Sequence, residues 1–168
     1  MANPLNNEQQ IYRRIKEEKI EVDPTLWDVM YHYLGDYVSS INLLAADSIE
    51  TNQPIPSEDA KKMLDYAMKA SRIVTKLTRP QKIQDDDEAN LIKIRDKKIT
   101  LHRDIQELFD HYIPNDLNII TMCVGYHLED SNLIPLNDVQ NILSCTKNII
   151  HFLDKLRIAT GQQRVIHD

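Results

Sequence analysis

The tripeptide His32-Tyr33-Leu34 decides the fold prediction, because His111-Tyr112-Ile113 repeats it at an offset of 79 residues, from position 32 to position 111. With this offset, residues 11–78 align with residues 90–157 without a gap. Self-similarity at a fixed offset is typical of a repeated structural unit. Identical residues occupy 13 aligned pairs: Ile15/Ile94, Lys19/Lys98, Ile20/Ile99, His32/His111, Tyr33/Tyr112, Ile41/Ile120, Glu50/Glu129, Ile55/Ile134, Pro56/Pro135, Asp59/Asp138, Leu64/Leu143, Lys76/Lys155 and Leu77/Leu156. The sequence therefore predicts one domain, residues 1–168, made of two repeats, 11–78 and 90–157, joined by an acidic linker, 79–89.

Composition favours long helices. Hydrophobic residues make up 42% of the chain and charged residues 27%, which is ordinary for a globular protein. Only three glycines occur among 168 residues, which argues against a turn-rich β fold. A chain of this length can enclose a hydrophobic core of its own.

Breaks in the hydrophobic pattern divide the first repeat into one short and two long helices. Asp23 and Pro24 mark the start of the second helix, because Asp caps a helix and Pro fits its first turn. Ser57 is expected to cap the third helix. The expected helices cover about residues 7–20, 24–50 and 57–77.

The second repeat is expected to follow the same plan, with helices over about residues 88–99, 101–128 and a last one after Pro135. Asn137 and Gln140 resemble a capping box, and Gly161 fits a helix C-terminus. Pro114 aligns with Gly35, and proline inside a helix predicts a kink or a break there. The fold class is therefore all-α: a duplicated helical hairpin that forms a pseudo-two-fold four-helix bundle with two short accessory helices.

Charge and hydropathy limit the classes of partner and the location that the sequence predicts. A net charge of −6 and a pI near 5.5 disfavour nucleic-acid binding. No apolar run reaches the roughly 20 residues of a membrane span, and the N-terminal residues lack the apolar core of a signal peptide. Cys123 and Cys145 fall in apolar helical patterns, which predicts reduced core thiols in a cytoplasmic protein. The acidic run 85–88 is interpreted as a solvated linker rather than a cation site.

The repeated histidine is the candidate site. His32 and His111 each follow a carboxylate by four residues, Asp28 and Glu107 respectively. Such a pair favours the imidazolium and orients the ring. His32 is expected to share a helix face with Asp36 and Ser39. The simpler interpretation is a surface pair that stabilises each helix.

The pattern His32-Tyr33-Leu34-x-x-x-Val38-x-x-Ile41 resembles the phospho-accepting helix of histidine-kinase dimerisation and histidine-phosphotransfer domains. In that family an exposed His begins an apolar helix that pairs with a second, antiparallel helix, and two such hairpins make a four-helix bundle. The resemblance covers about residues 30–77 and their repeat. It implies that His32, His111 or both accept a phosphoryl group, with Asp28 and Glu107 as orienting carboxylates. The chain has no Gly-rich nucleotide-binding domain, so autophosphorylation is not expected.

No nucleophile–base motif and no Glu-x-x-His metal pair occurs, so the sequence predicts no catalytic, cofactor or metal site. The leading prediction is a non-enzymatic, cytoplasmic interaction or regulatory module that binds a protein partner, without nucleic acid or membrane, as a monomer or homodimer. Its expected working surfaces are the paired long helices and the region around Gly35 and Pro114. The alternative is a histidine phosphotransfer protein in a two-component-type relay. Tyrosines at helical spacing are expected in the core or at an interface: Tyr31, Tyr33, Tyr37 and Tyr66.

Overall fold

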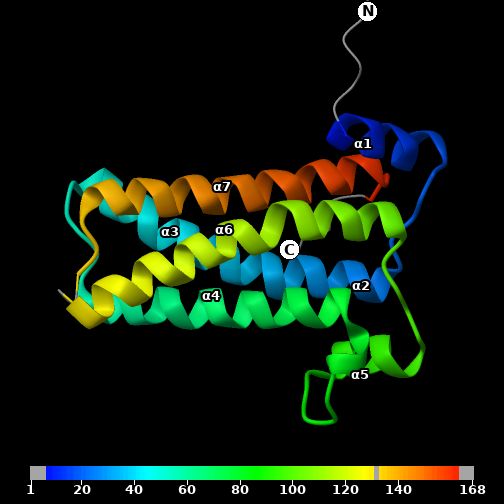
Figure 1. Ribbon diagram of the computed structural model, residues 1–168, viewed down its shortest axis with the longest axis horizontal. Helices are drawn as coiled ribbons and strands as arrows, with labels where there is room; N and C mark the ends of the chain where they lie inside the picture. Colours follow the sequence, from blue (N-terminus) through cyan, green and yellow to red (C-terminus); the bar gives the residue numbers. More distant parts are fainter. Residues whose placement is uncertain (1–6, 131–132, 163–168) are drawn as a thin grey trace, which may run out of the picture.

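The computed structural model describes residues 7–130 and 133–162, and this part of the chain is helical and contains no strand. Figure 1 shows the arrangement of the helices. The elements are α1 (Asn7–Glu17), α2 (Pro24–Asp28), the π-helix η1 (Val29–Gly35), α3 (Asp36–Thr51), α4 (Ser57–Thr78), the 3₁₀-helix η2 (Pro80–Lys82), α5 (Ala89–Asp96), α6 (Arg103–Asp130) and α7 (Leu136–Ala159). The all-α prediction is confirmed for these residues.

The long helices α3, α4, α6 and α7 lie side by side (Figure 1). Helix α3 packs against α4 and α7, and α6 packs against the same two helices. Helix α1 contacts α6 and α7, while α5 packs against α2 and η2. Each long helix therefore contacts one helix of its own half and one helix of the other half.

Helix bounds in the two halves are separated by the same 79 residues as the aligned sequences. Helix α2 begins at Pro24 and α6 at Arg103, and α4 begins at Ser57 and α7 at Leu136. Helix α3 ends at Thr51 and α6 at Asp130. The loops that follow α1 and α5 also agree, because Lys19 (φ 52°) and Lys98 (φ 54°) both adopt the left-handed conformation.

The turns between the long helices meet at one point. The Ile55 N–H donates to the Ile134 carbonyl at 3.0 Å, and the Ile134 N–H donates to the Ile55 carbonyl at 2.9 Å. These two residues are equivalent at the offset of 79, and both are buried. Equivalent residues of the two halves thus bind each other reciprocally.

Both core clusters contain side chains from both halves. One cluster includes Leu34, Ile113, Phe109 and Phe152, and the other includes Ile41, Ile120, Ile55 and Ile134. Burying one such side chain contributes about 1.5–3 kcal/mol. Aligned positions are buried together in the following pairs: Ile15/Ile94, Leu26/Ile105, Val29/Leu108, Met30/Phe109, Leu34/Ile113, Val38/Leu117, Ile41/Ile120, Met63/Ile142, Ile73/Phe152 and Leu77/Leu156.

The helices expected over residues 24–50 and 101–128 differ between the two halves in the structure. In the first half, the helix expected over residues 24–50 has a π-helical segment, η1, between α2 and α3. In the second half, α6 is continuous through Pro114, so of the two outcomes predicted there, a kink or a break, the break does not occur. Figure 1 shows that α6 changes direction near its middle, which is the usual response of a helix to an internal proline.

Side-chain caps fix the start of two helices. The Thr25 N–H donates to Asp23 Oδ1 at 2.8 Å, so the predicted cap of α2 is confirmed. At the equivalent start of α6, the Asp104 N–H donates to His102 Nδ1 at 3.1 Å. Each cap satisfies one N–H group of the first turn, which has no partner inside the helix.

Prolines, rather than side-chain caps, fix the start of α4 and α7. Pro56 (ψ 161°) and Pro135 (ψ 155°) are extended residues at the N-cap positions, without side-chain hydrogen bonds to the first turn. Ser57 is already helical, so its predicted capping role is wrong. Asn137 and Gln140 likewise lie inside α7, and the predicted capping box does not form.

The acidic linker is not solvated at Asp87, which corrects the sequence-based interpretation. Its side chain is 3% exposed, lies 2.5 Å from Arg72 Nη1, and also pairs with Lys76 on α4. Burial alone would raise the pKa of Asp87, but the hydrogen bond from the Gln84 N–H and the two cations lower it overall. The linker is thereby held against α4.

A second buried carboxylate joins α1 to the start of α6. Arg14 Nη2 donates to Asp104 Oδ1 at 3.0 Å, and Arg14 Nε donates to Asp104 Oδ2 at 3.2 Å. The Asp104 side chain is 6% exposed and that of Arg14 is 41% exposed. The hydrogen bonds from Arg14 lower the pKa of Asp104 despite its burial.

Asp104→Asn is expected to lower the free energy of unfolding by about 1–3 kcal/mol at pH 7, less than for a fully buried pair because Arg14 is partly solvated. The folded-state pKa of Asp104 lies below its unfolded value near 3.9, so this stabilisation is present above about pH 4 and is lost as the pH falls toward the folded pKa. Urea unfolding of both proteins at pH 7 and pH 3 measures the difference. The control is Asp65→Asn, which removes a surface pair with Lys69 and should change stability by less than about 1 kcal/mol. An Asp104→Asn penalty that does not shrink at pH 3 contradicts this assignment.

Candidate functional site

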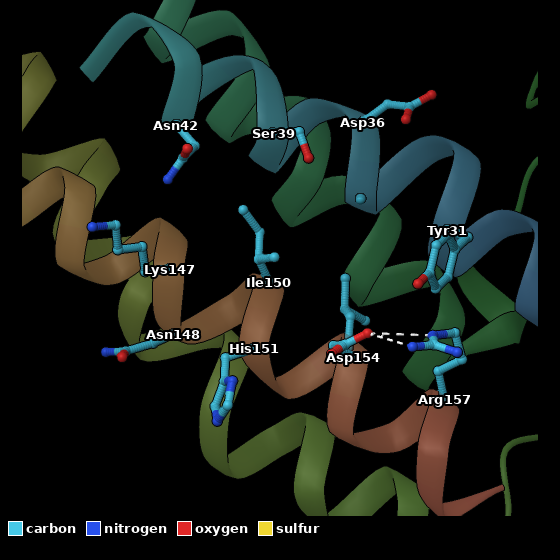
Figure 2. A pocket seen from close by; sticks show the side chains of 12 residues that line it. Tyr31, Asp36, Ser39, Asn42, Lys147, Asn148, Ile150, His151, Asp154 and Arg157 are labelled. Atoms are coloured by element: carbon cyan, nitrogen blue, oxygen red, sulfur yellow. Dashed lines mark hydrogen bonds and ion pairs between the residues drawn. The ribbon is translucent and has the colours of Figure 1, made fainter. Parts of the chain in front are cut away.

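A groove of about 850 Å³ lies between the η1–α3 segment and α7. We call it the α3–α7 groove, and Figure 2 shows most of its lining side chains. Most of its lining residues are polar or charged, but polar and apolar surface contribute to its walls in similar amounts. It is lined by Tyr31, Gly35, Asp36, Ser39 and Asn42 from η1 and α3, and by Lys147, Asn148, Ile150, His151, Leu153, Asp154 and Arg157 from α7.

One end of the groove holds a fixed guanidinium group. Arg157 donates to Asp154 Oδ1 from Nη2 at 2.8 Å and from Nε at 3.3 Å. Asp154 and, to a smaller extent, the Tyr31 side chain raise the pKa of Arg157. Figure 2 shows the Tyr31 hydroxyl turned toward this guanidinium. An aromatic ring and an oriented cation therefore lie next to each other at this end.

The other end is marked by Asn42 and Lys147. Asn42 Nδ2 donates to the hydroxyl of the buried Thr146 at 2.9 Å, which fixes the amide across the α3–α7 contact. Lys147 is exposed at the rim, and Ile150 points toward α3 between the two ends (Figure 2). From Lys147 to Arg157 is ten residues of α7, or about 15 Å at 1.5 Å per residue. The groove has a cation at each end and an apolar side chain between them.

The π-helical turn η1 contributes Tyr31 and Gly35 to the wall of the groove. The aligned positions of the continuous helix α6, Asp110 and Pro114, line the smaller groove described below, so the choice of positions does not depend on the π-helical geometry. Tyr31, Asp36 and Ser39 line the groove, but His32 is not among its lining residues. The predicted common face of His32, Asp36 and Ser39 is therefore not a common wall of this groove.

The predicted histidine sites differ between the halves. His32 Nε2 lies 3.2 Å from Asp28 Oδ1, with side chains 38% and 44% exposed, and Asp28 also accepts from Asn90 at 2.7 Å. His111 is exposed, and its ring packs edge-on against the Tyr112 ring, with 4.8 Å between the ring centroids. Glu107 accepts from Asn7 at 3.2 Å. Over residues 7–130 and 133–162, the carboxylate–imidazole pair thus forms at His32 and not at His111.

A smaller groove of about 390 Å³ occupies the equivalent place between α4 and α6. Pro114 and Asn118 line it where Gly35 and Ser39 line the α3–α7 groove. Asp110 and Thr78 stand at the positions that align with Tyr31 and Arg157. Both halves therefore form a groove at the predicted region around Gly35 and Pro114, but the aromatic ring and the guanidinium belong to the α3–α7 groove.

The two cysteines are free thiols at the core. Cys145 is buried and Cys123 is half-buried. Burial, with the nearby Asp138 carboxylate, raises the pKa of Cys123 to about 11, and burial, with Asp116, raises that of Cys145 to about 12. Neither thiol is therefore appreciably ionised at neutral pH, which disfavours a nucleophilic role.

The structure also brings together three side chains that the sequence analysis does not connect: Cys123, His127 and Asp138. Their ligand atoms all lie within 4.8 Å of one another. The signal in the sequence is the Cys-x-x-x-His spacing, which places both side chains on one face of a helix. Asp138 could not be added from spacing alone, because it comes from the next helix.

Comparison with known proteins finds no matching family model, no matching curated protein and no matching solved structure. None of the helices in the described part of the chain is both long enough and apolar enough to cross a membrane. The function of the groove is therefore inferred from its geometry.

Gly35→Ala and Gly125→Ala are each expected to raise the free energy of unfolding by about 0.5–1 kcal/mol, because alanine favours helical backbone more than glycine does. Gly35 has a helical φ of −59°, and a Cβ there would meet only the Met30 carbonyl at an ordinary 3.5 Å. Gly125 in α6 is the matched control, with nothing within 4 Å of an added Cβ. Urea unfolding of both variants tests this. A loss of stability for Gly35→Ala alone would show that the π-helical turn requires glycine.

Proposed function

We propose that this chain is a non-enzymatic, cytoplasmic interaction module that binds a segment of a protein partner in the α3–α7 groove. The observation that carries this proposal is the Tyr31–Arg157 end of the groove, held in place by Asp154. Tyr and Arg are enriched among the residues that contribute most to protein–protein binding. An oriented guanidinium also suits a carboxylate of the bound segment.

The dimensions and charges of the groove suit a short peptide segment. A length of about 15 Å matches roughly four to five residues of extended chain. The exposed Lys147 and the guanidinium of Arg157 stand at opposite ends, and Ile150 supplies apolar contact between them. A segment with an apolar side chain flanked by acidic residues would complement this pattern.

Binding fits the groove better than catalysis. Asp154 is engaged by Arg157, so this carboxylate is not poised as a general base. Figure 2 shows His151 and Asn148 on the side of α7 that faces away from α3. The polar groups of the groove therefore do not converge on a single reacting position.

We further infer that the fold is a four-helix bundle with pseudo-two-fold symmetry that arose by tandem duplication. Three observations support this: the shared offset of the helix bounds, the left-handed Lys19 and Lys98, and the reciprocal pairing of Ile55 with Ile134. Residues 11–78 and 90–157 are the repeats in this proposal, and α1 and α5 are the accessory helices. Duplication explains why two equivalent grooves exist.

The proposal predicts that Ser39→Arg abolishes partner binding, because a long cationic side chain would fill the α3–α7 groove. Asn118→Arg is the matched control, since it introduces the same side chain at the equivalent position of the α4–α6 groove. Affinity enrichment from a lysate of the native source, with wild type and both variants as baits, measures binding. We expect a partner recovered by wild type and Asn118→Arg, and at least tenfold less by Ser39→Arg. Equal recovery by all three baits contradicts binding in this groove, and no specific partner contradicts an interaction function.

Histidine phosphotransfer is the second candidate function, and the Asp28–His32 pair favours it. A half-exposed imidazole whose ring is oriented by a carboxylate one turn earlier suits a phospho-accepting role. This proposal predicts acid-labile phosphate on the imidazole of His32 in protein purified from its native source. Mass spectrometry at neutral to basic pH, with His32→Gln and His111→Gln variants, locates the phosphate. A wild-type protein without phosphohistidine under signalling conditions excludes this function.

A further inference from the structure

We propose that Cys123, His127 and Asp138 bind one divalent metal ion of the zinc class. The site lies where the end of α6 meets the start of α7, and it is separate from the α3–α7 groove. A thiolate, an imidazole and a carboxylate are all regular zinc ligands. The combination of sulfur and nitrogen donors favours zinc over magnesium or calcium.

Helices α6 and α7 bring the three ligand residues together without a change in the position of either helix. Cys123 and His127 are one turn apart on α6, so their side chains project from the same face. Asp138 lies in the first turn of α7 and reaches across to His127, with 2.5 Å between His127 Nε2 and Asp138 Oδ2. All three ligand atoms are within 4.8 Å of one another.

These separations are close to those of a tetrahedral zinc site. Zinc–ligand bonds of about 2.0–2.3 Å place neighbouring ligand atoms about 3.2–3.8 Å apart. An ion between His127 and Asp138 would lengthen their contact by about 1 Å, while Cys123 Sγ would move inward. In this proposal both changes are rotations of the side chains, and the helices α6 and α7 stay in place.

The surroundings favour a retained ion. The His127 side chain is 13% exposed and the Asp138 side chain 35% exposed, so the site is shielded on one side and open on the other. Cys123 packs against the core cluster that includes Ile41 and Ile120. The Tyr126 ring lies edge-on to the His127 ring, with 5.2 Å between the ring centroids. Three protein ligands would leave the fourth position, on the open side, for water.

The fold itself does not require these three residues together. The aligned positions in the first half are Leu44, Ser48 and Asp59. Asp59 is 4.0 Å from Lys62 of its own helix, and Ser48 donates to the Gln53 carbonyl of the turn. The first half therefore closes the same helix junction without a Cys or a His. The second half has two metal-ligand residue types, Cys and His, beside an aspartate that both halves share.

Cobalt titration of the reduced wild-type protein tests this proposal, because a cobalt–thiolate bond gives a charge-transfer band and tetrahedral cobalt absorbs in the visible. We expect saturation at one equivalent of Co²⁺, displacement by one equivalent of Zn²⁺ and a rise in the melting temperature with Zn²⁺. Cys123→Ser should abolish the charge-transfer band, and Asp138→Asn should weaken binding at least about 100-fold.

Two matched controls separate this site from other donors. Cys145→Ala removes the other thiol, and Asp59→Asn removes the equivalent carboxylate of the first half; both should bind cobalt like wild type. Circular dichroism of each variant checks folding, and the wild-type titration stands by itself if a variant does not fold. A wild type without the charge-transfer band overturns the proposal. Persistence of the band in Cys123→Ser, or equal loss in either control, also overturns it.

Discussion

The apolar face of each helical hairpin is the constraint on which this structure depends, because neither hairpin can cover its own. Helices α3 and α4 contact each other along one side, and each needs a helix of the other half to complete its burial. Aligned residues such as Leu34 and Ile113 are therefore fully buried in a single cluster to which both halves contribute. Removing one hairpin would expose many side chains at about 25 cal/mol per Å² of apolar surface, so the two halves fold as one unit.

A core shared by two aligned halves leaves the surface of each half free to differ. Most core positions have apolar residues in both halves, since a change of volume on one side has to be matched on the other. The groove positions have no such restriction. Tyr31 and Arg157 in one groove correspond to Asp110 and Thr78 in the other, and the grooves differ in volume accordingly, at about 850 and 390 Å³. This difference is why we assign binding to one groove rather than to both.

Sequence reasoning could predict the features that local residues determine. The restart at Asp23-Pro24 and the breaks at Pro56 and Pro135 depend on backbone chemistry within a few residues, and the helices begin there. The π-helical turn could not be predicted, because no residue between Val29 and Gly35 requires it and it depends on packing. The same holds for Asp87, whose burial depends on Arg72 and Lys76 from α4. The α3–α7 groove and the Cys123–His127–Asp138 cluster also combine residues of different helices, which spacing within one helix does not reveal.

The groove and the proposed metal site lie at different places along α7 and are linked only through this helix. Asp138 lies in the first turn of this helix, and Lys147 at the near end of the groove follows nine residues later, which corresponds to about 14 Å along the axis. Arg157 at the far end is 19 residues from Asp138, or about 28 Å. Over these distances, with no ligand in common, substitutions at the two sites should have additive effects on stability. A metal ion at the α6–α7 junction would hold the start of α7, the helix that forms one wall of the groove. It would therefore affect partner binding only through the rigidity of α7. Loss of metal would then weaken partner binding slightly, whereas loss of the Tyr31–Arg157 contact would remove binding and leave the metal in place.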